Sequence, residues 1–222
     1  MDVLAASGFT VAGAVAAVPM TAVAYSAPAH GGISLPERWW RGAPARLSAV
    51  AAMSALTGTV TGLITTCLPR SPGLPAFWVF AVLGVGLAVI DIRRHRLPHL
   101  LTASMVAACL VSFVVAAGIS GNIHPLLRAV AVGMVFASVL FIVALLLPGQ
   151  LGLGDVALTG AVALNLGWLG WQDAIVGVLC GLLVQGITGL AATIRAHSND
   201  PTPMGPALVA GWFVSVLLTQ VT

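Results

Sequence analysis

Charged residues are scarce in this sequence. They make up 7% of its 222 residues, and lysine is absent altogether. An ordinary soluble domain carries about 25% charged residues, so this composition excludes a soluble globular domain. The nine arginines form no basic patch of the kind that binds nucleic acid, and we expect no nucleic-acid partner.

Residues that commonly form disulfides and metal sites are also few. Cys67, Cys109 and Cys180 occur singly in or beside apolar segments, and no CxxC pair exists. We therefore expect them to be small buried residues rather than disulfide partners or metal ligands. No HExxH spacing occurs, so we expect no metal or organic cofactor. We interpret the five histidines as residues of interfacial loops: His30, His95, His99, His124 and His197.

Long apolar runs dominate the sequence instead. Hydrophobic residues make up 59% of the chain, and the mean hydropathy is +1.06. Runs of about 18 or more apolar residues predict membrane-spanning helices. We predict an all-α, polytopic membrane bundle that forms a single domain over residues 1–222. The expected helices number about eight, near residues 3–24, 47–68, 76–92, 99–118, 125–147, 156–170, 174–194 and 205–221.

The arginines predict the orientation of these helices. Seven of the nine lie in or beside the loops after the first, third and seventh expected helices. The positive-inside rule makes these loops cytoplasmic and places the N-terminus outside. The opening segment MDVLAASG lacks a basic region, so we expect the first apolar segment to be a retained helix.

Two of the six acidic residues lie at helix ends. Asp91 ends the third expected helix, and Asp155 begins the sixth, both at the cytoplasmic edge. A carboxylate costs roughly 2.5 to 3.5 kcal/mol at the bilayer centre and less near the interface, so membrane acids usually face the protein interior. Because the two acids lie at one level, we expect a common site. The other four lie at the terminus or in polar loops: Asp2, Glu37, Asp173 and Asp200.

Paired carboxylates suit general acid and base chemistry. Two close carboxylates cannot both ionise easily, so one holds a proton while the other acts as a base. Gly152 and Gly154, just before Asp155, allow a substrate backbone to approach closely. A structural alternative remains open, in which Asp155 only caps its helix and Asp91 pairs with Arg94 or Arg96.

Three ordered segments resemble the prepilin peptidases, also called type IV leader peptidases. Asp91 followed by Leu97, Pro98 and His99 is similar to the family's first aspartate signature. Gly152, Gly154 and Asp155 reproduce its GxGD element. PMGPALVAG, from Pro203, is similar to the family's PFGP segment, so the resemblance runs from about residue 40 to the C-terminus.

This resemblance implies a membrane aspartic endopeptidase that removes the leader peptide of type IV prepilins or pseudopilins at the cytoplasmic membrane edge. Asp91 and Asp155 would be the catalytic pair, while Gly152, Gly154, Pro98 and Gly205 would shape the site. The implied partners are these precursor proteins and the lipid bilayer, and no cofactor is implied. The loop over residues 25–46 stands where many members carry a CxxC domain, so the chain resembles a short form.

Two departures from the family pattern keep alternatives open. Ala157 stands where the family usually has lysine, and His99 stands where it usually has asparagine. A catalytically degenerate relative, acting as a membrane scaffold or precursor binder, would explain both. A small transporter or channel that uses the paired acids as a relay is the other alternative, although transport predicts acids at mid-membrane.

Overall fold

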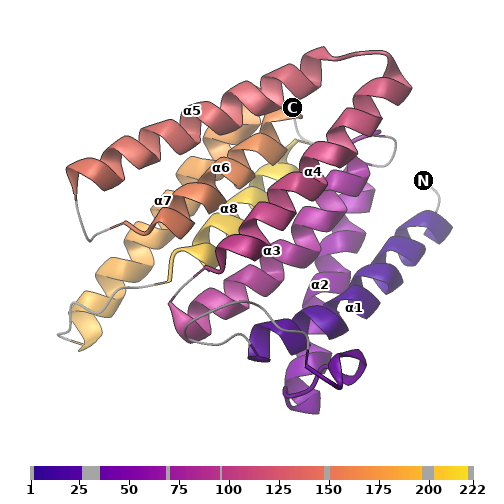
Figure 1. Ribbon diagram of the computed structural model, residues 1–222, viewed down its shortest axis with the longest axis vertical. Helices are drawn as coiled ribbons and strands as arrows, with labels where there is room; N and C mark the ends of the chain where they lie inside the picture. The colour runs from indigo at the N-terminus through magenta and orange to yellow at the C-terminus, as the bar shows by residue number, and fades with distance from the viewer. Residues whose placement is uncertain are drawn as a thin grey trace.

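The computed structural model describes residues 3–26, 36–68, 71–95, 97–147, 151–196 and 203–219. These residues form eight α-helices and one short 3-10 helix, and they contain no strand, which confirms the all-α prediction (Figure 1). Arg70, Arg96, His30 and His197 lie outside the described residues. The elements are α1 (Val3–Ser26), η1 (Trp39–Arg41), α2 (Leu47–Cys67), α3 (Leu74–Arg94), α4 (His99–Ser120), α5 (His124–Leu146), α6 (Leu153–Gly167), α7 (Trp171–Ala196) and α8 (Gly205–Leu218).

Six of the eight helices are long and apolar enough to cross a membrane, so the chain is a multi-pass membrane protein. The remaining two, α6 and α8, have 15 and 14 residues. At 1.5 Å per residue they are about 22 Å long, which is less than the roughly 30 Å of a bilayer core. Both helices are therefore shorter than the thickness of the bilayer core.

Proline and glycine mark several helix ends, as their backbone preferences require. Proline occupies the first turn of α3, α5 and α8, where the missing N–H costs nothing. Gly121 ends α4 in the left-handed conformation, with φ of 64°.

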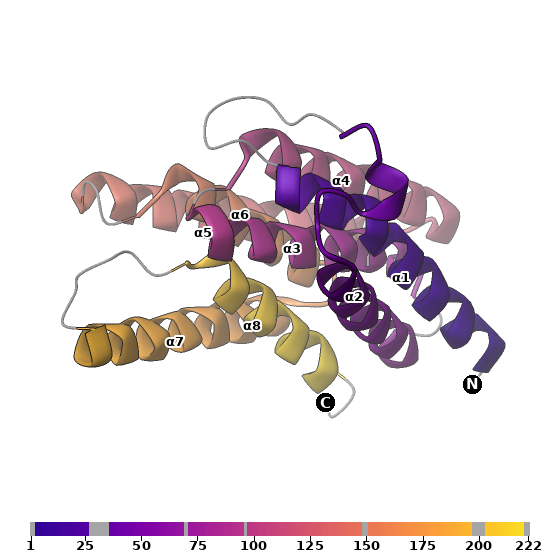
Figure 2. The same cartoon turned by 90° about the horizontal axis from the view of Figure 1, so that it is seen from below.

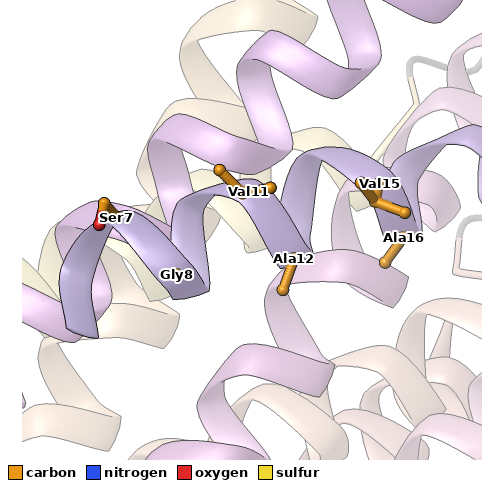
Figure 3. Close-up of a pocket in the computed structure, with 6 residues that line it drawn as sticks. All are labelled: Ser7, Gly8, Val11, Ala12, Val15 and Ala16. Atoms are coloured by element: carbon orange, nitrogen blue, oxygen red, sulfur yellow. The ribbon is translucent and has the colours of Figure 1, made fainter. Parts of the chain in front are cut away.

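The helices pack largely as sequential pairs around α3. Figure 2 shows α7 beside α8 and, in another part of the bundle, α1 beside α2, and contacts are also extensive between α5 and α6. In the α1–α2 pair, Thr61 Oγ1 donates a hydrogen bond to the carbonyl of Phe9 at 3.2 Å. The outer face of α1 presents small residues around a shallow, open hollow (Figure 3).

A buried polar chain crosses the aromatic core. Trp212 Nε1 donates a hydrogen bond to Asn165 Oδ1 at 2.8 Å, and Asn165 Nδ2 lies 3.8 Å from Cys109 Sγ. This chain ties α8 to α6 and α4, because buried polar groups require partners. Cys109 and Cys67 are buried, as expected of small core residues, and Cys180 is half-buried.

Arg128 of α5 fixes the C-terminal end of α6. Its Nε donates to the carbonyl of Gly167 at 2.9 Å, and its Nη2 donates to the carbonyls of Trp168 and Leu169 at 2.6 and 2.8 Å. A cation at a helix C-terminus also interacts favourably with the helix dipole. Arg128 therefore satisfies carbonyls that have no partner within the helix.

We expect Arg128→Ala to lower the free energy of unfolding by about 2 kcal/mol, because hydrogen bonds from a charged donor are lost. Thermal unfolding in detergent measures the change. Arg46→Ala is the matched control, since Arg46 is an exposed arginine at the start of α2. Equal changes for the two variants would show that the contacts with α6 do not stabilise the fold.

Candidate active site

Asp91 lies in the last turn of α3 and is held from two sides. Its side chain is 4% exposed, and its Oδ2 accepts a hydrogen bond from the backbone N–H of Gly205 at 2.7 Å. Its own carbonyl accepts the N–H of His95 at 2.7 Å, which ends α3 in a left-handed turn. A buried carboxylate requires such donors, so Asp91 is fixed where the start of α8 meets the end of α3.

Asp155 lies in the first turn of α6 and is half-buried. The backbone N–H of Gly152 donates to its Oδ2 at 3.3 Å, so Asp155 caps its own helix. An acid in the first turn also interacts favourably with the positive end of the helix dipole. Asp155 therefore caps its helix, as the structural alternative proposed. The cap occupies only one of the two carboxylate oxygens.

The two carboxylates share one cavity of about 300 Å³. Asp91 and Asp155 line it together with Gly152, Gly154 and Leu153. The two acids are close enough to interact electrostatically. α3 and α6 thus bring two acids that are far apart in the sequence to one cavity that is large enough to hold water.

The cavity lies where several helices meet. The ends of α3 and the starts of α4, α6 and α8 all contribute residues to it or to its carboxylates. Helix N-termini carry unpaired N–H groups and partial positive charge, which favour an anion. Backbone N–H groups at the starts of α6 and α8 each donate to one carboxylate.

Gly154 and Gly205 both allow close approach at this site. A Cβ atom on Gly154 would lie 2.9 Å from the Cβ of Leu97, which precedes α4. A Cβ atom on Gly205 would lie 3.0 Å from Asp91 Oδ2. Pro98 lies outside the cavity lining and is the N-cap of α4 in extended conformation. It positions the start of α4 rather than the cavity wall.

The structure gives Asp91 a partner other than the predicted arginines. Its carboxylate accepts from Gly205, while the neighbouring Arg93 guanidinium lies 3.5 Å from the ring centroid of Tyr25 in α1. We considered Arg94 and Arg96 as ion-pair partners of Asp91. Arg94 is exposed, and Arg96 lies outside the described residues. The arginines at the end of α3 therefore border the site without filling it.

His95 and His99 also line the cavity. From the sequence we assigned both to interfacial loops and placed only His99 in the first aspartate signature. The sequence did hold one indication that His95 lies near Asp91. The two residues are four positions apart, and residues at that spacing lie on the same side of a helix. His99 begins α4, four residues after His95. The cavity wall thus contains two imidazoles beside two carboxylates.

No grouping of three or more histidine, cysteine or acidic side chains suited to a metal ion occurs in the described part of the chain. The cavity and its carboxylates present carboxyl groups, imidazoles and backbone N–H groups. Such a set can accept and donate protons around one water molecule.

Comparison with known proteins gives a consistent identification. Residues 77–194 match the sequence profile of the type IV leader peptidase family, and this range includes both aspartates. A prepilin leader peptidase/N-methyltransferase of Aeromonas salmonicida (strain A449) is 32% identical over 184 residues, covering 78% of this chain and 60% of that protein. A protein of the same name from Aeromonas hydrophila is 28% identical over 177 residues, with the same coverage. No solved structure matches the chain.

The chain belongs to the type IV leader peptidase family, because the family profile covers more than half of it. It spans about 60% of the length of the curated relatives that it matches.

Proposed function

We propose that this member of the type IV leader peptidase family is an aspartic endopeptidase that removes the leader peptide of type IV prepilins or pseudopilins. The observation that carries the proposal is the shared cavity, in which Asp91 of α3 and Asp155 of α6 line one space of about 300 Å³. The names of the relatives support the substrate class.

In the proposed reaction, one carboxylate takes a proton from a water molecule in the cavity. The water oxygen then forms a bond to the scissile carbonyl carbon, while the other carboxyl group protonates the carbonyl oxygen. The carbon–nitrogen bond of the resulting gem-diol then breaks as the amide nitrogen takes up a proton from one acid, while a gem-diol hydroxyl gives its proton to the other acid and becomes the carbonyl of the new carboxyl terminus. The pair finishes with one proton between the two acids, as it began, and no metal or organic cofactor takes part.

The N–H groups of Gly205 and Gly152 position the two acids in this mechanism. Each donates to Oδ2, so each carboxyl group is oriented by its backbone donor. Gly154 lets Leu97, just before α4, pack closely against the start of α6 at the cavity wall.

A cleavage assay tests the proposal directly. The purified protein is incubated with a precursor from its own genome that has a short leader, a glycine and then an apolar helix. Appearance of a product shortened at the glycine supports the proposal. A precursor that binds tightly and is never shortened would instead support the catalytically degenerate binder.

We further propose that the cavity faces the cytoplasm of a bacterial inner membrane, with the N-terminus outside. Arg38, Arg41 and Arg46 precede α2, and Arg93 and Arg94 end α3 beside Tyr25 at the end of α1. The positive-inside rule assigns this end of the bundle to the cytoplasm.

This orientation predicts that cysteines introduced by Arg94→Cys and by Ser120→Cys are labelled from opposite sides. Both positions are exposed, one at the end of α3 and one at the end of α4. A membrane-impermeant maleimide applied to intact cells should label only the Ser120→Cys variant. The unsubstituted chain controls for the native cysteines. Labelling of both variants from one side would contradict a membrane-crossing α4.

A further inference from the structure

A second hollow, of about 360 Å³, lies between α4, α5 and α6 and is distinct from the carboxylate cavity. In Figure 1, α4 and α5 diverge from their connection and α6 lies between them. α5 packs extensively on α6 but touches α4 little. The three helices therefore form a groove whose floor is the α5–α6 contact and whose other wall is α4. We call this the α4–α6 groove.

The lining of the α4–α6 groove is apolar and mostly small. Ala137 of α5 and Ala157 of α6 line it, with Val106 and Leu110 of α4 on the far wall. Ala157 is exposed, and Ala137 is half-buried because it packs against Gly160 of α6, so neither is fully covered by the protein. Small residues let helix backbones approach closely in membranes, where packing rather than the hydrophobic effect drives association.

Met134 stands at the edge of the α4–α6 groove and is 65% exposed. An unbranched methionine adapts its shape to different apolar partners. The groove is therefore open towards the membrane, from which an apolar segment can enter sideways.

The α4–α6 groove and the carboxylate cavity both lie against one face of α4. His99 lines the cavity, and Val106 and Leu110 line the groove seven and eleven residues later. These spacings put all three residues on the same face of a helix. His99 and Val106 are separated by about 10 Å along the axis, which about three extended residues span. A chain that joins the two sites must pass around the N-terminus of α6, since Asp155 and Ala157 lie on different sides of that helix.

We propose that the α4–α6 groove binds the apolar helix of the precursor whose leader is cleaved in the carboxylate cavity. The inference rests on the proposed function, because that reaction requires a substrate bond just before a membrane helix. A helix seated against Ala137 and Ala157 places its preceding residues along the His99 face of α4. The groove then sets which bond reaches Asp91 and Asp155, and it favours substrates that carry a long apolar helix.

Photo-cross-linking tests where the helix binds. A model precursor is used that has a short leader ending in glycine, followed by an apolar helix of about 20 residues. A photoreactive residue replaces Met134 or, as the matched control, Val139, which is 51% exposed on the same helix and outside the groove lining. The Asp155→Asn background keeps the precursor intact. We expect cross-links from position 134 to the precursor helix and few from position 139. Equal cross-linking at both positions, or products with lipid only, would overturn the proposal.

Cleavage selectivity provides the second test. Ala137→Leu fills the groove, whereas Ala131→Leu makes the same change at an exposed alanine of α5 that lies outside the lining. We expect Ala137→Leu to reduce kcat/KM for the model precursor about tenfold relative to a short peptide that spans the scissile bond and lacks the helix. Ala131→Leu should keep the wild-type ratio.

The two tests separate this inference from the proposed function. If the wild type cleaves the precursor but Ala137→Leu lowers cleavage of both substrates equally, the groove assignment is wrong and the peptidase stands. If the wild type cleaves neither substrate while position 134 still cross-links to the precursor, the peptidase proposal fails and the docking surface stands.

Discussion

Asp91→Asn and Asp155→Asn should each reduce precursor cleavage by at least about 100-fold, because each substitution removes one half of the acid and base pair. Asparagine keeps the shape of the side chain and an oxygen that can accept the N–H of Gly205 or Gly152. The fold should therefore survive while the proton-transfer chemistry is lost. The measurement is the initial cleavage rate of purified variants at equal concentration, with thermal unfolding recorded alongside.

Asp173→Asn is the matched control for these variants. Asp173 also lies half-buried in the first turn of a helix, where its Oδ1 accepts a hydrogen bond from Thr219 at 3.1 Å. It does not line the carboxylate cavity. Its substitution should leave the cleavage rate within about twofold of wild type. Near-wild-type cleavage by either cavity variant would show that the dyad assignment is wrong.

The helices were predictable because apolar runs and their breakers are local features. The run before Arg93 predicted a helix that ends near residue 92, and α3 ends at Arg94. Likewise, proline at 206 marks the start of α8 in the sequence and in the structure. Membrane helices need long uninterrupted apolar segments, so even one sequence defines them well.

The site was only partly predictable, since its contacts join distant segments. Scarcity of acids singled out Asp91 and Asp155, and the structure places both in one cavity. The hydrogen bond from Gly205 to Asp91 spans 114 residues, and no local pattern encodes it. The position of His95 depends on the left-handed turn at φ of 51°, an uncommon conformation for histidine.

The structure changes the interpretation of Ala157. From the sequence it counted as a departure from the family pattern beside the second aspartate. In the structure it is an exposed residue of the α4–α6 groove and not of the carboxylate cavity. The absence of lysine there leaves the cavity wall unchanged, because Ala157 lies on another side of α6 from Asp155.

Gly205→Val should reduce cleavage about 100-fold while membrane insertion is retained, because the new side chain displaces Asp91. A Cβ atom at this position would lie 3.0 Å from Asp91 Oδ2 and 3.2 Å from Asp91 Cβ, closer than nearly all real contacts of this kind. Asp91 must therefore shift by a few tenths of an ångström, which strains its 2.7 Å hydrogen bond to the Gly205 N–H and changes its position in the cavity.

Gly186→Val is the matched control, because nothing lies within 4 Å of a Cβ atom on that glycine of α7. Both variants place valine in a helix and incur a similar local cost, so a difference between them reports on Asp91. Initial rates for the two variants, with a precursor-binding measurement, separate a misplaced acid from lost substrate affinity. Gly205→Val with wild-type kcat would show that the start of α8 does not position Asp91 for the reaction.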